Sequence, residues 1–138
     1  MPVHGYPPTD PREWLQRARS SLAIARCCRP DIYPEDLCFQ AQQAAEKAIK
    51  AVFIARGLPF PYIHDLADLL FRLEKSGLDI PDAIKKASSL TPFAAQTRYP
   101  GFECPVSKEE YMQACALAES VVRWAEDSIR KQGSSKST

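Results

Sequence analysis

The chain has 138 residues, the size of one ordinary domain, and its formal net charge of +1 excludes the overall basic field that attracts nucleic acids. Apolar residues make up 45% and charged residues 25% of the sequence, as in a globular domain rather than a disordered chain. No run of about 18 apolar residues occurs and the N-terminus lacks a signal-peptide stretch, so we expect a cytoplasmic protein without membrane contact.

The beginning of the chain predicts an arm followed by a helix. Three prolines among the first nine residues predict a flexible arm over residues 1–9. A helix is expected from Asp10 to about Arg29, where Pro30 ends it. Asp10 is a suitable N-cap, and Glu13 has the spacing that completes a capping box.

A second helix is expected from Pro34 to Gly57, which is a natural C-cap. Small side chains dominate its apolar stripe, which comprises Leu37, Ala41, Ala44, Ala45, Ala48, Ile49, Val52 and Phe53. Alanines at these positions let a neighbouring helix approach closely. The less apolar side carries Gln40, Gln43, Glu46, Lys47 and Lys50, and we interpret it as a solvated face.

The middle of the chain predicts an apolar, proline-stiffened loop over residues 58–63. A third helix is expected to open at His64 and to end at Gly77. A shorter helical segment over residues 81–90 and a helical turn over residues 91–95 follow.

The last helix begins at Ser107, where Glu110 completes an S-x-x-E capping box, and its apolar period continues to about Lys131. Residues 133–138 are expected to form a disordered tail. No segment alternates like a strand. The sequence therefore predicts one all-α domain over residues 10–132, an up-and-down antiparallel bundle of about five helices.

The cysteines do not indicate a metal site. Five are present at irregular spacing, Cys27, Cys28, Cys38, Cys104 and Cys115, and only two histidines accompany them. A zinc site requires about four converging ligands. We expect reduced thiols, with Cys28, Cys38 and Cys115 buried or half-buried in helices, and neither a metal nor a cofactor.

Three short strings occur in a characteristic order. They are Phe39–Ala51 (FQAQQAAEKAIKA), His64–Leu70 (HDLADLL) and Thr97–Gly101 (TRYPG), and a final amphipathic helix follows. Over about residues 12–131 the chain resembles the HEPN domain (higher eukaryotes and prokaryotes nucleotide-binding domain). The resemblance implies a five-helix, usually dimeric bundle. It also implies one of two activities: partnership with a minimal nucleotidyltransferase in a toxin–antitoxin pair, or metal-independent ribonuclease activity through an Arg-x(4–6)-His motif.

The sequence departs from that ribonuclease motif. His4 has no arginine before it, and seven residues separate Arg56 from His64. Gly57, Pro59 and Pro61 lie within that interval, so the two side chains do not share one helical face. Whether the protein is an enzyme therefore stays open.

The candidate site residues are those that suit phosphate and proton chemistry. Histidine transfers protons near neutral pH and arginine binds phosphate through two donors, which selects His64 and Arg98, with Tyr99 as a stacking or hydroxyl partner. His64 alternatively binds a backbone amide or packs between helices, and Arg98 alternatively forms a salt bridge or a helix cap. Lys47 suits a nucleotide phosphate and Gln43 an adenine edge.

Two surface features add to these candidates. Arg17, Arg19, Arg26 and Arg29 make the first helix basic, and are either solvated or in contact with RNA or an acidic partner. Phe60, Tyr62, Tyr99 and Phe102 suggest core or dimer packing, with base stacking as the alternative.

Three functions remain. The first is a nucleotide-binding, regulatory module that forms a homodimer and partners a minimal nucleotidyltransferase. The second is a ribonuclease toxin with a degenerate site at His64 and Arg98, and the third is a purely structural dimerisation domain.

Overall fold

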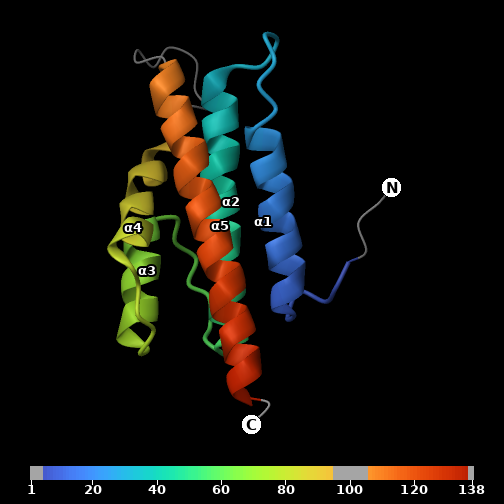
Figure 1. The fold of residues 1–138 in the computed structure, drawn as a ribbon, viewed down its shortest axis with the longest axis vertical. Coiled ribbons are helices and arrows are strands. Elements are labelled where there is room, and N and C mark those ends of the chain that lie inside the picture. Colours follow the sequence, from blue (N-terminus) through green and yellow to red (C-terminus); the bar gives the residue numbers. More distant parts are fainter. Residues whose placement is uncertain (1–4, 95–105, 137–138) are drawn as a thin grey trace.

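The computed structural model describes residues 5–94 and 106–136, which are helical apart from their connections. The elements are α1 (Pro11–Ala25), α2 (Pro34–Ala55), α3 (Leu66–Lys75), α4 (Asp82–Lys85), the 3₁₀ helix η1 (Lys86–Ala94) and α5 (Lys108–Lys136). No strand occurs in these two stretches. The predicted all-α bundle of about five helices is confirmed (Figure 1).

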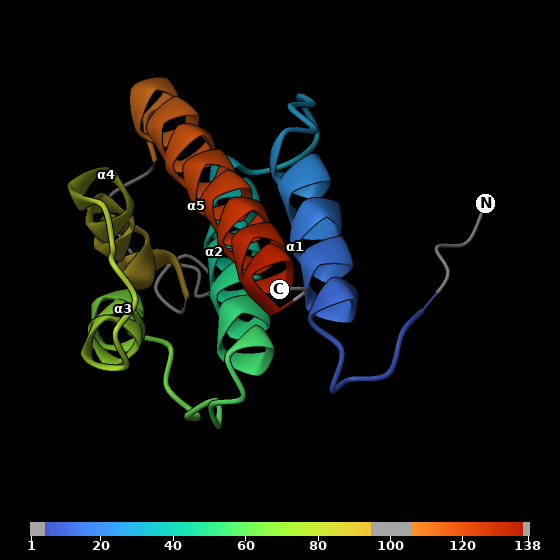
Figure 2. The same ribbon diagram turned by 60° about the horizontal axis from the view of Figure 1, so that its bottom comes forward.

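Helix α2 is the centre of the bundle. It packs against α1 on one side and against α5 along its length, and α3, α4 and η1 lie on the side away from α1 (Figures 1 and 2). Helix α1 runs antiparallel to both α2 and α5, whereas α2 and α5 run in the same direction. Helices α2 and α5 can run in the same direction because the chain after α2 does not turn directly into α3. It returns along α2 first, as the contacts of His64 described below show.

Helix starts follow local capping chemistry. The Asp10 carboxylate accepts a hydrogen bond from the Arg12 amide (2.9 Å) and caps α1. Ser107 and Glu110 form the expected reciprocal capping box, with N–O distances of 3.1 and 3.0 Å. Glu13 does not complete a box at α1. Its carboxylate accepts from the Tyr6 amide (2.9 Å) instead, so residue 6 is attached to α1.

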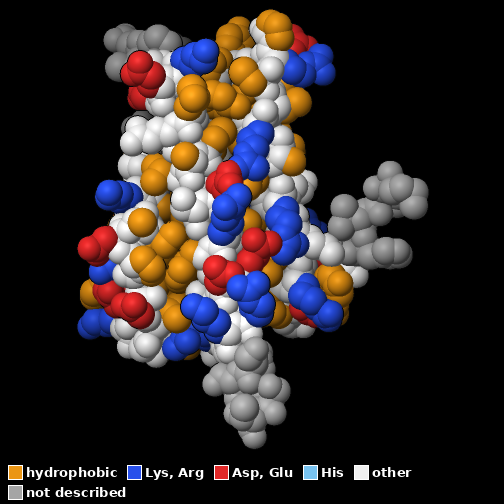
Figure 3. All heavy atoms as spheres, viewed as in Figure 1, with side chains coloured by type: hydrophobic (Ala, Val, Ile, Leu, Met, Phe, Trp, Pro, Cys, Tyr) orange, Lys and Arg blue, Asp and Glu red, His pale blue; other side chains and the backbone are white. Residues whose placement is uncertain are grey.

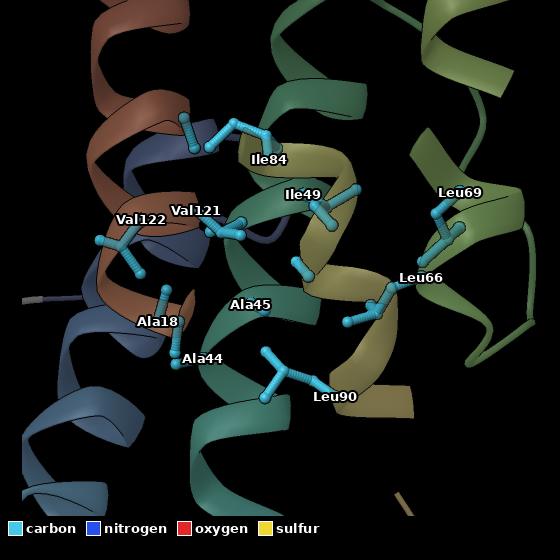
Figure 4. Packing of buried hydrophobic residues seen from close by; sticks show 14 of the residues in the cluster. Ala18, Ala44, Ala45, Ile49, Leu66, Leu69, Ile84, Leu90, Val121 and Val122 are labelled. Atoms are coloured by element: carbon cyan, nitrogen blue, oxygen red, sulfur yellow. The ribbon is translucent and has the colours of Figure 1, made fainter. Parts of the chain in front are cut away.

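The core consists of small side chains between α1, α2 and α5 and larger ones toward α3 and η1. Ala18, Ala44, Ala45 and Ala48 are 0% exposed. Figure 4 shows side chains of all the helices meeting around this part of α2, with Ile49 directed toward the α4–η1 side. The predicted alanine stripe is therefore the close-packing seam of the bundle.

Three boundaries differ from those predicted. Helix α1 ends at Ala25 rather than near Arg29, because the Cys27 and Cys28 amides already bond to carbonyls two or three residues back in a tight turn. Cys28 is consequently exposed rather than half-buried in a helix, whereas Cys38 is buried and Cys115 half-buried as expected. Helix α5 extends to Lys136, beyond the expected end.

The third helix also begins later than predicted. Asp65 is its N-cap and accepts from the Ala67 amide (3.0 Å), so α3 starts at Leu66. His64 therefore precedes the helix and belongs to the loop that follows α2. Because His64 lies outside α3, its imidazole reaches back to Glu46 of α2.

The surface shown in Figure 3 divides into two regions. Hydrophobic side chains gather where α5 begins and α1 ends, and charged side chains of both signs gather further along α1 and α5. The exposed hydrophobic side chains at the first end include Ile24, Tyr33 and Met112. No helix in the described residues is long and apolar enough to cross a membrane.

Candidate functional site

A chain of hydrogen-bonded polar side chains lies on α2. Gln43 Nε2 donates to Gln42 Oε1 (2.8 Å), and Gln42 Nε2 donates to Glu46 Oε1 (3.0 Å). Gln42 is 0% exposed, which is unusual for a glutamine and requires that its amide be hydrogen-bonded. The two bonds meet that requirement and fix the Glu46 carboxylate in one orientation.

His64 joins this chain from the loop that follows α2. Its Nδ1 lies 2.9 Å from Glu46 Oε1, although the two residues are 18 positions apart in the sequence. The His64 side chain is 71% exposed, while the Glu46 side chain is only 14% exposed. A carboxylate partner favours the tautomer with the proton on Nδ1, which leaves Nε2 directed to solvent as the reactive nitrogen.

The loop is held against α2 at Leu58, at Phe60 and at His64. The Leu58 amide donates to the Phe53 carbonyl (2.9 Å), and the Phe60 ring meets the Phe53 ring edge-on with centroids 5.3 Å apart. Lys50 Nζ lies 5.1 Å from the Phe60 ring centroid. These contacts and the His64 bond follow successive turns of α2, so the loop is positioned by several independent interactions.

Lys47 lies beside this network, between α2 and α1. Its Nζ donates to Ser21 Oγ (2.8 Å), and Ser21 is only 2% exposed. Burial lowers the pKa of Lys47, and the neighbouring Arg17 cation lowers it further. Lys47 forms no ion pair with a carboxylate in the part of the chain that the structure describes. The prediction of a fully solvated face on α2 is therefore wrong, since Gln43, Glu46, Lys47 and Lys50 are all half-buried.

The cations around Lys47 outnumber the acids that pair with them. Lys50 Nζ lies 3.9 Å from the Trp14 ring centroid and has no ion-pair partner among the described residues. Arg17 pairs with Glu13 at 2.5 Å and lies over the same indole, 5.7 Å from its centroid. The side chains around Lys47 at the α1–α2 boundary thus include more cations than acids that pair with them, although the net charge of the chain is close to zero.

The other arginines of the first helical region are neutralised. Arg19 pairs with Glu126 of α5 at 2.5 Å, Arg26 pairs with Glu119 of α5, and Arg29 pairs with the neighbouring Asp31. Two of these pairs connect α1 to α5. The basic character predicted for this region is therefore largely cancelled within the bundle.

Not every predicted site residue can be placed. His64, Gln43 and Lys47 lie on one side of α2, joined through Gln42 and Glu46 or adjacent to them in the helix. Arg98 and Tyr99, like Phe102, lie outside the described residues.

Sequence reasoning missed Gln42 and Ser21 as parts of the site. The spacing of Gln42 and Glu46, four residues apart on a helix, was the available signal for the first. Ser21 has no comparable signal, because its bond to Lys47 joins two helices.

The site contains the imidazole of His64, which a carboxylate orients. It also contains the half-buried ammonium of Lys47, which has no ion-pair partner among the described residues. An imidazole oriented by a carboxylate is placed to act as a general acid or base. A half-buried ammonium attracts phosphate more strongly than an exposed one, because less solvent screens it. Within the described residues no group of three or more potential ligands is placed to hold a metal ion.

Comparisons with known proteins identify the family of the chain. The HEPN domain family model matches residues 11–128. Two similar solved structures, each with a TM-score of 0.70, are ST0689, described as an archaeal HEPN homologue, and TT1696 from Thermus thermophilus. ST0689 is 24% identical and the match covers 87% of this chain and 98% of that one. TT1696 is 30% identical, with 86% and 97% covered.

A search of curated proteins finds no significant match. The family model spans all the described helices except the end of α5, and the likeness to ST0689 independently shows the same fold. The chain belongs to the HEPN domain family.

Proposed function

We propose that this protein is a nucleotide-binding, regulatory module that partners a minimal nucleotidyltransferase in a toxin–antitoxin-type pair. The observation that carries the nucleotide part is Lys47, a half-buried ammonium that bonds to Ser21 and forms no ion pair among the described residues, with the charge of Glu46 as its acidic neighbour. A nucleotide phosphate is the natural counter-charge for such a group, because it restores the interaction that burial removed.

Gln43 supports the same ligand. One N–H of its amide is used by Gln42, while its second N–H and its carbonyl oxygen have no partner in the described structure. These two groups match the donor and acceptor that an adenine edge presents. Lys47 follows one helical turn later on the same face of α2, so a single ligand can contact both side chains.

The partnership and the homodimer rest on surface chemistry. Ile24 near the end of α1, Tyr33 just before α2 and Met112 near the start of α5 expose between 47% and 75% of their surface. Figure 3 shows hydrophobic side chains gathered at this end of the bundle. Exposed apolar side chains that gather in one region mark protein interfaces. A second copy or the nucleotidyltransferase would cover this end of the bundle, and the nucleotide would bind beside Lys47.

Isothermal titration calorimetry with ATP tests the nucleotide site. We expect wild type to bind ATP and Lys47→Met to bind at least about tenfold more weakly, the value of one charge-assisted contact. Lys75→Met is the matched control, because Lys75 is exposed and lies over Phe71 on α3, on the side of the bundle away from α1 (Figure 1). No heat of binding to wild type, or equal affinity in Lys47→Met, contradicts the proposed site.

Co-expression tests the partnership. A tagged minimal nucleotidyltransferase is expected to co-purify with the wild-type protein, and multi-angle light scattering of the protein alone is expected to give a dimer. A monomer that fails to retain the nucleotidyltransferase would contradict this part of the proposal.

The second candidate function, metal-independent RNA cleavage, is favoured by the His64–Glu46 pair. Its geometry, an exposed imidazole oriented by a mostly buried carboxylate, is the one that general acid–base catalysis requires. Incubation with total RNA in EDTA decides between the two functions. Cleavage that disappears in His64→Ala and falls in Glu46→Gln supports the ribonuclease, and an inactive wild type excludes it.

A further inference from the structure

Tyr62 is the most exposed large hydrophobic side chain of the described residues. Its relative exposure is 100%, against 75% for Tyr33 and 58% for Met112. No hydrogen bond or ring contact involves it in the part of the chain that the structure describes. A tyrosine ring that is wholly in water has both faces free for a ligand to stack on.

The backbone that carries Tyr62 is held firmly. Pro59 and Pro61 restrict it from within, and Phe60 is fixed against Phe53 and Lys50. On the other side, Ile63 packs against the core and His64 bonds to Glu46. The ring is therefore presented from a rigid segment, and binding a ligand on it costs little ordering entropy.

Tyr62 lies next to the nucleotide site. Tyr62 precedes the half-buried Ile63, and His64, which follows it, bonds back to Glu46 of α2. Two residues span at most about 7 Å, which places the Tyr62 backbone within that distance of the residue that contacts Glu46. Glu46 immediately precedes Lys47 on α2. Phe60, two residues before Tyr62, has Lys50 Nζ 5.1 Å from its ring centroid, and Lys50 follows Lys47 by three residues on α2. The loop that carries Tyr62 therefore runs beside the part of α2 that carries Lys47.

We propose that Tyr62 is the stacking platform for the nucleobase of the nucleotide bound at Lys47. The inference rests on the proposed nucleotide-binding function and adds to it the residue that recognises the base. Stacking uses the face of the base, so Gln43 remains free to contact the base edge. It also distinguishes a nucleotide from a free polyphosphate, which Lys47 alone does not.

Calorimetry with two ligands, ATP and inorganic triphosphate, tests the inference. We expect Tyr62→Ala to weaken ATP binding about tenfold, the value of one aromatic stack, and to leave triphosphate binding unchanged. Tyr62→Phe keeps the ring and is expected to bind ATP like wild type. Phe71→Ala, which removes an exposed aromatic ring on α3, is the control and is expected to have no effect.

Each outcome separates the stacking role from the nucleotide site itself. Equal ATP affinity in wild type and Tyr62→Ala overturns the stacking role, even where Lys47→Met still weakens both ligands. Loss of triphosphate binding in Tyr62→Ala also overturns it, because the effect is then not on the base. Should wild type bind neither ligand, both the stacking role and the proposed function fail.

Discussion

Replacing Gln42 with methionine tests whether the buried polar chain on α2 holds the site together. Methionine has a similar length and volume, so it fills the same space without the amide. The substitution removes the bond that Gln42 donates to Glu46 and the bond that it accepts from Gln43. Because Gln42 is 0% exposed, water cannot replace the lost partners without opening the structure.

The expected loss follows from those two bonds. A hydrogen bond to an ionised carboxylate contributes about 1.5–3 kcal/mol and a neutral one about 0.5–1.5 kcal/mol. Burial of the added apolar surface offsets part of this sum, so we expect Gln42→Met to lower the free energy of unfolding by about 1–3 kcal/mol. Gln42→Ala leaves a cavity in addition and is expected to be the less stable of the two variants.

Urea unfolding followed by the fluorescence of Trp14 and Trp124 measures these differences. With a slope of about 1–3 kcal/mol per molar urea, Gln42→Met is expected to move the midpoint down by about 1 M. Gln40→Met is the control, since Gln40 is half-buried on the same helix and makes no side-chain hydrogen bond within the described structure. Equal midpoints for Gln42→Met and Gln40→Met would refute the reasoning.

Three further changes test the packing, the alkaline titration and a helix cap. Ala48→Leu inserts three carbons at a 0% exposed position of the seam and is expected to lower the free energy of unfolding by about 1–3 kcal/mol. The melting temperature measures this loss, and an unchanged melting temperature would show unoccupied space at Ala48. Burial raises the pKa of Tyr111 from 10.0 to about 12, so its contribution to stability is complete below pH 10 and is lost as the pH rises toward 12. Tyr111→Phe also removes the hydrogen bond to the Ala25 carbonyl, so we expect it to lower the stability at pH 8 and to flatten the decline of stability between pH 10 and 12. Urea midpoints from pH 8 to pH 12 measure both effects, and an unaltered decline counts against the raised pKa of Tyr111. Asp65→Ala removes the cap of α3 and is expected to cost about 1 kcal/mol in urea unfolding, with no loss being the contrary result.

Local chemistry explains what was predictable in this fold. Asp10 and Ser107 cap helices because the amides they bind lie two or three residues away, so their spacing in the sequence is sufficient. The alanine stripe of α2 was likewise readable, because helical periodicity places its members on one face whatever packs there.

Contacts between distant segments were not predictable. Glu13 has the spacing of a capping-box partner, but the Asp10 amide already donates to the Pro7 carbonyl, and Glu13 turns to the Tyr6 amide instead. His64 was expected at a helix start. Its role depends on a loop that doubles back along α2, which brings together two residues 18 positions apart.

The same difference between local contacts and contacts of distant segments applies to the candidate site. Lys47 and Gln43 were identified from their residue types, yet their burial, which gives them their chemical interest, follows from the packing of α1 and the loop against α2. A sequence pattern records which face of a helix is polar. It does not record whether another segment later covers that face.

Photo-crosslinking with an azido derivative of ATP, followed by mass spectrometry of the labelled peptides, tests most directly whether the nucleotide lies on this face of α2. The proposed site predicts labelling within residues 42–50 of α2 or residues 58–64 of the loop, abolished by excess ATP and reduced in Lys47→Met. Labelling confined to other segments, or labelling that ATP does not compete away, would contradict the account.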